Sequence, residues 1–146
     1  MLNFKIYNSS NLITNDTKTE LIEFLHKHLE QFCDPKESIE KAIAYAMNET
    51  SGPGGFLLQG KLAEETVGVV VMNKTGMEGY IPANILVYIA VDPKFRGKGY
   101  GKELMKKAIS IAEGSVKLHV EHDNPARFLY EKLGFTNKYM EMRLNR

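Results

Sequence analysis

The stretch "VDPKFRGKGYGKEL", Val91 to Leu104, places three glycines at alternate positions among cations, between an apolar run and a segment with helical periodicity. A glycine inside a structured segment costs roughly 0.5 to 1 kcal/mol relative to alanine, so three of them indicate tight turning or close approach of a ligand. A strand, a turn and a helix N-terminus in this order expose backbone amides at the positive end of a helix dipole. The stretch therefore predicts a phosphate site.

The charge around this turn agrees with an anionic ligand. Six cations against two anions (Asp92, Glu103) give a local balance of +4, the cations being Lys94, Arg96, Lys98, Lys102, Lys106 and Lys107. A P-loop would need Ser or Thr where Glu103 stands. A dinucleotide fingerprint would follow the first strand, whereas these glycines follow about the fourth. The alternatives left open are another phosphate ligand and a solvated basic turn.

Upstream of the turn, the pattern predicts two helices and then β structure. Ala83–Val91 is apolar on both faces, as in an internal strand with helices on each side. The elements predicted before it are a strand at Phe4–Tyr7, a helix from Thr17 with a capping box to Glu20, a helix capped by Asp34, and a hairpin of Phe56–Leu62 and Thr66–Met72. Downstream we expect a helix at Gly99–Ala112, a strand at Ser115–Val120, a helix capped by Asn124 and ended by Gly134, and one or two strands in Phe135–Leu144.

Length and composition describe one ordinary globular domain, residues 1–146, with 43% hydrophobic and 25% charged residues. The net charge of +1 gives no general reason to expect a nucleic acid or membrane partner. No signal-peptide pattern is visible and the longest apolar run, Ile85–Val91, is too short to span a bilayer, so a cytoplasmic location is expected. His26, His28 and Cys33 do not form a ligand set, and no metal is expected.

The turn also resembles a known family. Arg96, Gly99 and Gly101 fit the Arg/Gln-x-x-Gly-x-Gly/Ala pattern of the GNAT superfamily of acyl-coenzyme A dependent N-acetyltransferases, and "NPARFLYEKLGF" resembles that family's second motif. The resemblance implies an α/β (α+β) fold, with a mixed, mostly antiparallel sheet of about six to seven strands and helices on both faces. It also implies acetyl-CoA as co-substrate.

The same resemblance implies a set of cofactor contacts. The coenzyme A pyrophosphate would lie on Arg96, Gly97, Lys98, Gly99, Tyr100, Gly101 and Lys102. Backbone groups of Ile89 and Val91 would pair with the pantetheine arm, and a bulge in this strand would aim an amide near Ile89 or Ala90 at the thioester carbonyl. Asn124 would contact pantetheine or seat the last helix, although the commoner family spacing falls on Asp123.

Acetyl transfer needs a neutral amine, stabilisation of the carbonyl oxyanion and a proton for the thiolate. Tyr130 is placed beside the sulfur by the resemblance, where its phenol would act as general acid; spacing alone favours core packing with Phe128, Leu129 and Leu133. The glutamate that some members carry early in the long strand is absent, because Asn84 and Ile85 stand there. His119 and Glu121, alternating on the following strand, are the candidate bases, and surface placement is the alternative for each.

The sequence leaves the acceptor open. Carboxylates at Glu30, Asp34 and Glu37 would suit a cationic amine, and solvated helix ends explain them equally well. We expect N-acetylation of a primary amine on a small molecule, peptide or protein, by a monomer or homodimer. The alternatives are a non-catalytic acyl-CoA-binding module and, less compatible with the balanced charge, an RNA-binding protein.

Overall fold

The computed structural model describes residues 1–146 as one five-stranded sheet flanked by helices. The strands are β1 (Asn3–Tyr7), β2 (Gly55–Leu62), β3 (Glu65–Lys74), β4 (Asn84–Val91) and β5 (Val116–Leu118). The α-helices are α1 (Asn15–His28), α2 (Lys36–Ala46), α3 (Tyr100–Ile111) and α4 (Ala126–Lys132), and the 3-10 helices are η1 (Glu30–Phe32) and η2 (Pro93–Phe95). No helix has the length and apolar character needed to cross a membrane.

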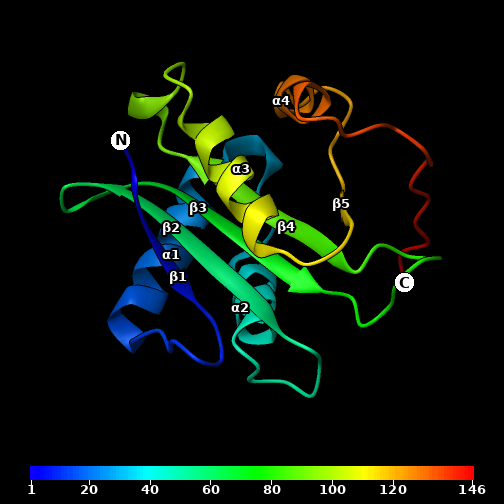
Figure 1. The fold of residues 1–146 in the computed structure, drawn as a ribbon, viewed down its shortest axis with the longest axis horizontal. Helices are drawn as coiled ribbons and strands as arrows, with labels where there is room; N and C mark the ends of the chain where they lie inside the picture. Colours follow the sequence, from blue (N-terminus) through cyan, green and yellow to red (C-terminus); the bar gives the residue numbers. More distant parts are fainter.

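The strands lie side by side in the order in which they occur in the chain. β1 to β4 pair antiparallel, and β5 joins β4 in parallel after the crossover through α3. Figure 1 shows α3 crossing one face of the sheet while α1 and α2 cover the other face. The predicted fold class, a mixed and mostly antiparallel sheet with helices on both faces, is confirmed.

The core consists of two apolar layers separated by the sheet. One layer packs α1 and α2 against Leu57, Val69 and Val71, and the other packs α3 and α4 against residues such as Leu58 and Val70. β3 lies in the middle of the sheet, and its side chains are buried except at its two ends. Successive side chains of a strand point to opposite faces, so a strand covered on both sides is mostly apolar, as β3 is between the buried polar residues Thr66 and Asn73.

β4 contains a bulge at Val87. Tyr88 lies opposite Val71 and Leu86 lies opposite Met72, so one residue of β4 has no partner in β3. After the bulge, each side chain of β4 faces the layer opposite to the one that a regular strand would give it. Leu86 packs in the α3 layer, Val87 and Tyr88 both pack in the α1 and α2 layer, and Ile89 returns to the α3 layer.

The end of the sheet differs from the prediction of six to seven strands. The sheet has five, because Phe135–Leu144 forms no strand and β5 stops at Leu118 instead of reaching Val120. The exposed side chains of this segment include Tyr139, Met140, Met142 and Leu144. Their alternation is typical of a strand, but the side chains are not buried against the rest of the chain, so the pattern lacks the packing that stabilises one.

Two helix starts also differ from the prediction. Thr14, not Thr17, caps α1, and its hydroxyl accepts a 3.2 Å hydrogen bond from Thr17 N. Asp34 does not cap α2; its carboxylate accepts a hydrogen bond from Tyr88 instead. The predicted Gly134 end of α4 is confirmed by its φ of +99° and by the bond from Phe135 N to Tyr130 O at 3.0 Å.

Candidate active site

The glycine-rich turn presents a row of free backbone amides at the start of α3. The N–H groups of Gly97 to Lys102 have no hydrogen-bond acceptor in the protein, and the first bond of α3 is donated by Glu103 N to Gly99 O. Free N–H groups at a helix N-terminus, next to the positive end of the dipole, bind phosphate. The turn thus has the donors that a pyrophosphate needs.

The glycines are required by the backbone conformation of the turn. Gly97 and Gly99 have φ of +78° and +85°, and a Cβ added at either would meet nothing within 4 Å. L-residues rarely adopt this region, and the open space leaves the amides approachable. Gly101 has a different reason: its Cβ would lie 3.5 Å from Leu129 of α4, so a small residue lets the two helices approach. The chain therefore fits a pyrophosphate at this turn.

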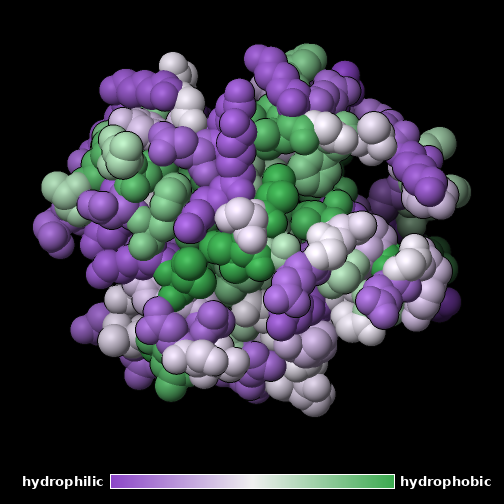
Figure 2. All heavy atoms as spheres, in the orientation of Figure 1, coloured by the Kyte–Doolittle hydropathy of each residue, from purple (hydrophilic) through white to green (hydrophobic).

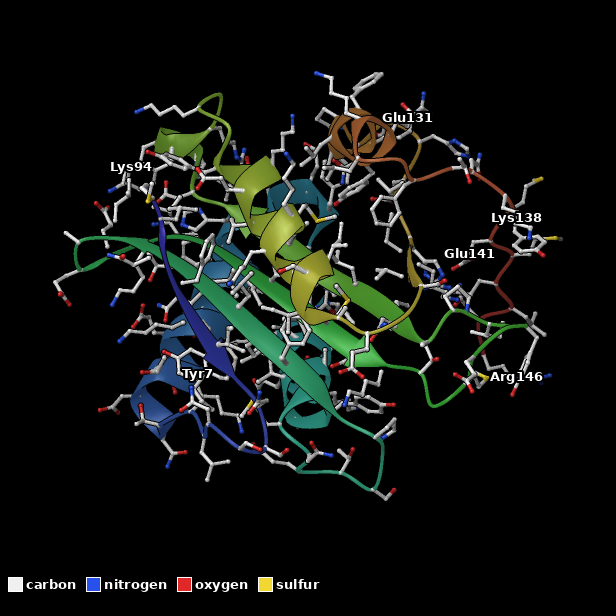
Figure 3. The ribbon with its side chains drawn as sticks, in the orientation of Figure 1. Tyr7, Lys94, Glu131, Lys138, Glu141 and Arg146 are labelled. Carbon is white, nitrogen blue, oxygen red and sulfur yellow. The ribbon has the colours of Figure 1, made fainter.

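The cations near the turn are not equivalent. Lys94 forms an ion pair with Glu65, the first residue of β3. Lys98 and Lys102, in contrast, have no acidic partner. Figure 3 shows Lys94 at the connection from β4 to α3, on the opposite side of the molecule from Lys138 and Glu141 of the C-terminal segment. Lys98 is exposed and is free to approach a ligand at the amides.

The Arg96 side chain turns toward the end of α1 rather than toward the free amides. Its Nη1 donates to Glu30 Oε1 at 2.5 Å, its Nη2 donates to the carbonyl of His28 at 3.1 Å and its Nε donates to the carbonyl of Val91 at 3.0 Å. The guanidinium therefore has three protein partners, and the pyrophosphate contact expected for Arg96 stays a prediction.

β4 and β5 separate beside this turn. They pair only from Asn84 with Val116 to Leu86 with Leu118. Asp92 N donates to Val67 O, so the backbone groups of Tyr88, Ala90 and Asp92 point to β3. Those of Ile89 and Val91 consequently point to the other side, where β5 no longer runs. In Figure 1 the chain after β5 continues to α4 instead of following β4. We call this open edge of β4 the split edge.

The two amides predicted near the thioester differ in direction. Ile89 faces the split edge, whereas Ala90 lies opposite Val69 and its backbone groups bond within the sheet. Of this pair, only Ile89 can offer its N–H to a ligand between β4 and β5.

Tyr130 lies in the apolar layer under α3 and α4, together with Ile89 and Val91. It is 7% exposed, and its ring lies 6.0 Å from that of Phe135. Burial raises the pKa of Tyr130 to about 12, so the phenol stays protonated at neutral pH. Of the neighbours expected from spacing, Phe128 is 59% exposed and points away, under Arg127. Tyr130 is thus a core residue that keeps its phenolic proton at neutral pH and belongs to the same apolar layer as Ile89 and Val91.

Figure 2 shows apolar side chains at the surface between α3 and α4, with hydrophilic side chains around them. This is the face on which the free amides of the turn and the buried ring of Tyr130 lie, since α3 carries the turn and α4 carries Tyr130. An apolar surface beside phosphate donors suits a ligand with a charged end and a less polar arm.

Asn124 caps α4, as predicted. Its Oδ1 accepts a 2.9 Å hydrogen bond from Ala126 N and its carbonyl accepts a 3.2 Å bond from Arg127 N. The side-chain NH₂ group of Asn124 donates to no protein acceptor and is therefore free to donate to a ligand. Asp123 is exposed and takes no part in the cap.

The candidate bases do not lie on a strand, contrary to the prediction. β5 ends at Leu118, so His119 follows it directly and Glu121 belongs to the turn before α4. Both side chains are exposed. The carbonyl of Glu121 accepts a bond from Asn124 N at 3.0 Å, which fixes this turn. The alternation on one strand face that linked the two residues is therefore absent.

The connection between α1 and α2, residues Leu29–Pro35, lies against β4 on the opposite face. Tyr88 Oη donates to Asp34 Oδ2 at 2.6 Å, and Arg96 holds Glu30 at the other end of the connection. Glu30 has a φ of +56°, unusual for a residue with a side chain. Sequence reasoning missed Tyr88 because its partner is 54 residues away; the only signal was a polar hydroxyl inside an otherwise apolar strand.

The comparisons with known proteins agree with this geometry. Residues 19–135 match the acetyltransferase (GNAT) family, and the chain belongs to that family. Over 54 residues it is 46% identical to the [ribosomal protein bS18]-alanine N-acetyltransferase of Haemophilus influenzae, covering 34% of this chain and 37% of that protein. Over 79 residues it is 38% identical to N-alpha-acetyltransferase 30 of Xenopus laevis, covering 51% of this chain and 29% of that protein.

These matches span about a third of the length of the curated relatives. A solved structure of AAC(6')-Iy in complex with the bisubstrate analog CoA-S-monomethyl-acetylneamine has the same fold, with a TM-score of 0.69 and 10% identity over 100% of this chain and 98% of that one. The predicted family is thereby confirmed by the family match, and the predicted fold by the structural likeness.

Proposed function

We propose that this acetyltransferase is an acetyl-CoA dependent N-acetyltransferase, which transfers an acetyl group to a primary amine by direct attack on the thioester. The observation that carries the proposal is the meeting of two features: the free amides of Gly97 to Lys102 and the split edge of β4 beside them. The first suits the phosphates of coenzyme A and the second suits its pantetheine arm. The family membership supports the cofactor.

In this arrangement Ile89 and Val91 pair with the pantetheine amides as a neighbouring strand would. The carbonyl of Val91 already accepts from Arg96 Nε, and its second lone pair remains available. The side-chain N–H group of Asn124 binds the same arm from the α4 side. Bound acetyl-CoA supplies the acetyl thioester.

The transfer forms a C–N bond and breaks a C–S bond. The amine lone pair attacks the carbonyl carbon, and the N–H of Ile89 stabilises the negative charge that develops on the oxygen. Tyr130 donates its proton to the departing thiolate and regains one from solvent. A phenol with pKa about 12 is protonated at any physiological pH, which a donor requires.

The amine loses its proton to water or to one of the two exposed candidates. His119 is favoured over Glu121, because it follows Leu118, the last residue of β5 that pairs with β4. Glu121 lies two residues further, in the turn that leads to α4. His119→Gln should lower kcat/KM more than Glu121→Gln does, and equal small effects would assign the proton to water.

A protein or peptide α-amine is the first acceptor class to test. The two curated relatives are named as an alanine N-acetyltransferase acting on ribosomal protein bS18 and as an N-alpha-acetyltransferase. Lysine side chains, polyamines, amino sugars and small metabolites complete the panel.

The test is release of free thiol from acetyl-CoA in the presence of each amine, with the product identified by mass. An acetylated product that requires both substrates supports the proposal. Binding of coenzyme A in calorimetry, without thiol release for any amine, would instead support the non-catalytic acyl-CoA-binding module. No binding at millimolar coenzyme A would reject both.

A further inference from the structure

The Arg96 side chain joins three parts of the molecule that the sequence keeps apart. Its donors reach the carbonyl of His28 at the end of α1, the carboxylate of Glu30 in η1 and the carbonyl of Val91 at the end of β4. Two of the three acceptors are carbonyls that regular structure leaves without a partner at an element's end. A cation at a helix C-terminus is also favoured by the helix dipole.

These contacts fasten one end of the α1–α2 connection, Leu29–Pro35. Its other end is fastened by the Tyr88 hydroxyl on Asp34, at 2.6 Å. Both anchors belong to β4 or to the turn that follows it, so the connection is held across the part of β4 that faces the split. His28 adds a third contact, with its Nε2 3.7 Å from Asp92 Oδ2.

The connection lies on the face of the sheet opposite to the free amides. α3 and Tyr130 pack in one apolar layer, whereas α1, α2 and Tyr88 pack in the other. If coenzyme A occupies the α3 side of the split edge, as proposed above, the amine reaches the thioester from the side of the α1–α2 connection. The position of this connection then decides which amines can approach.

We infer that Arg96 is a positioning residue, which holds the α1–α2 connection against the end of β4 and so shapes the acceptor side of the site. It does not act as a ligand of the coenzyme phosphates. The assignment of the acceptor side rests on the proposed function, whereas the clamp itself rests only on the contacts of Arg96. A guanidinium can serve three acceptors in a plane, and a lysine ammonium cannot reproduce this geometry.

The single cysteine of the chain reports on the clamp. Cys33 lies in the α1–α2 connection and is partly buried, and its one S–H group can donate to the carbonyl of His26 or of Asp34, whose oxygens lie 3.4 and 3.0 Å from Sγ. If Arg96 holds the connection, loosening it exposes the thiol more often. The rate of alkylation by N-ethylmaleimide, followed by intact mass without any ligand, measures this exposure.

Four variants are compared with the wild type: Arg96→Ala, Arg96→Lys, Glu30→Gln and the control Lys98→Ala. We expect the rate of Cys33 alkylation to rise about fivefold in Arg96→Ala and about twofold in Glu30→Gln. These factors correspond to the stabilisation that a partly exposed ion pair usually gives. Arg96→Lys should behave like Arg96→Ala. Lys98→Ala removes a cation from the same turn that has no contact with the connection, and it should alkylate at the wild-type rate. Glu30→Gln is the milder change, since it keeps the size of the exposed Glu30 side chain, and it tests the clamp if Arg96→Ala fails to fold.

Binding of desulfo-coenzyme A, which carries no thiol, separates the two roles of Arg96. If Arg96 is a positioning residue, both Arg96→Lys and Arg96→Ala should raise the KM of the amine. The Kd of desulfo-coenzyme A should rise by a smaller factor in the same variants. If Cys33 is alkylated at the wild-type rate in Arg96→Ala and Glu30→Gln, or if Arg96→Lys restores a cofactor affinity lost in Arg96→Ala, the inference is wrong. Failure of the wild type to bind desulfo-coenzyme A rejects the proposed function, while the alkylation rates still decide on the clamp.

Discussion

The hydroxyl of Tyr88 donates a 2.6 Å hydrogen bond to Asp34 Oδ2, and so ties the strand after the bulge to the start of α2. Burial and this bond to a carboxylate raise the pKa of Tyr88 above its usual value. Above about pH 10 the unfolded chain loses this phenolic proton while the folded protein keeps it. The folded state then binds more protons, so the free energy of unfolding falls as the pH rises beyond about 10.

Tyr88→Phe tests this relationship. The ring stays in the core, and the loss of one hydrogen bond should lower the free energy of unfolding by about 0.5 to 1.5 kcal/mol near neutral pH. The decline above about pH 10 should become shallower but not vanish, because burial also raises the pKa of Tyr7 and Tyr130. Urea titrations at several pH values measure both effects. Tyr139→Phe is the control, because this side chain is 78% exposed. If the free energy of unfolding of Tyr88→Phe fell with pH as steeply as that of the wild type, the raised pKa would not belong to Tyr88.

Gly99→Ala should separate backbone strain from blocked access. Gly79 has the same conformation, with a φ of +79° against +85°, and its Cβ would also meet nothing within 4 Å. Both alanine variants should therefore lose similar stability, about 1 to 2 kcal/mol. Only Gly99→Ala should also lower the affinity for coenzyme A, by about tenfold or more, because its methyl group covers the free amides. Calorimetry measures the affinity, and equal affinities for the two variants would place the ligand elsewhere.

Lys98→Ala should raise the KM of the acyl-coenzyme A by a larger factor than it lowers kcat, since an exposed cation aids phosphate binding before and during the reaction alike. The effect should shrink as salt is added, because exposed charges are screened over about 8 to 10 Å near physiological ionic strength. Lys94→Ala is the matched control, for Lys94 is paired with Glu65. A loss that does not depend on salt would indicate a structural effect of Lys98.

Tyr130→Phe removes the proposed proton donor and keeps the ring beside Phe135. Desolvation by burial is the sole cause of its raised pKa, with no hydrogen bond contributing, so the variant leaves no polar partner unsatisfied in the core. The melting temperature and cofactor affinity should stay near wild type, while kcat falls by about 100- to 10,000-fold if thiolate departure limits the rate. A near-normal kcat in a protein that binds the cofactor would return Tyr130 to a packing role.

The strand, turn and helix around the glycines were predictable because each local signal points the same way. Gly97 and Gly99 need a positive φ, and the apolar run before them has the length of an internal strand. Asn124 also caps its helix as expected, since an asparagine before proline offers its oxygen to the first free amide. These features depend on neighbours within a few residues.

The rest depended on contacts between distant residues. Asp34 is a good cap by spacing, yet its carboxylate binds Tyr88 from another element. The bond from Arg96 to Glu30 could not be predicted from local sequence either, because Glu30 lies 66 residues away in the chain and next to Arg96 in space. The segment Phe135–Leu144 has the alternation of a strand, but alternation specifies only which side chains share a face, not whether anything covers that face.

The bulge at Val87 changes which residues of β4, even-numbered or odd-numbered, point their backbone groups away from β3. Before it, even-numbered residues such as Asn84 and Leu86 direct their backbone to β5; after it, the odd-numbered Ile89 and Val91 face the split. A chimera that replaces β4 with a regular strand of the same length, without the bulge, would therefore keep every upstream pairing and shift every downstream one by one residue. The Tyr88 side chain would then face away from Asp34 and the amide of Ile89 would turn toward β3, so a strand of this length places both groups only if it also forms the bulge.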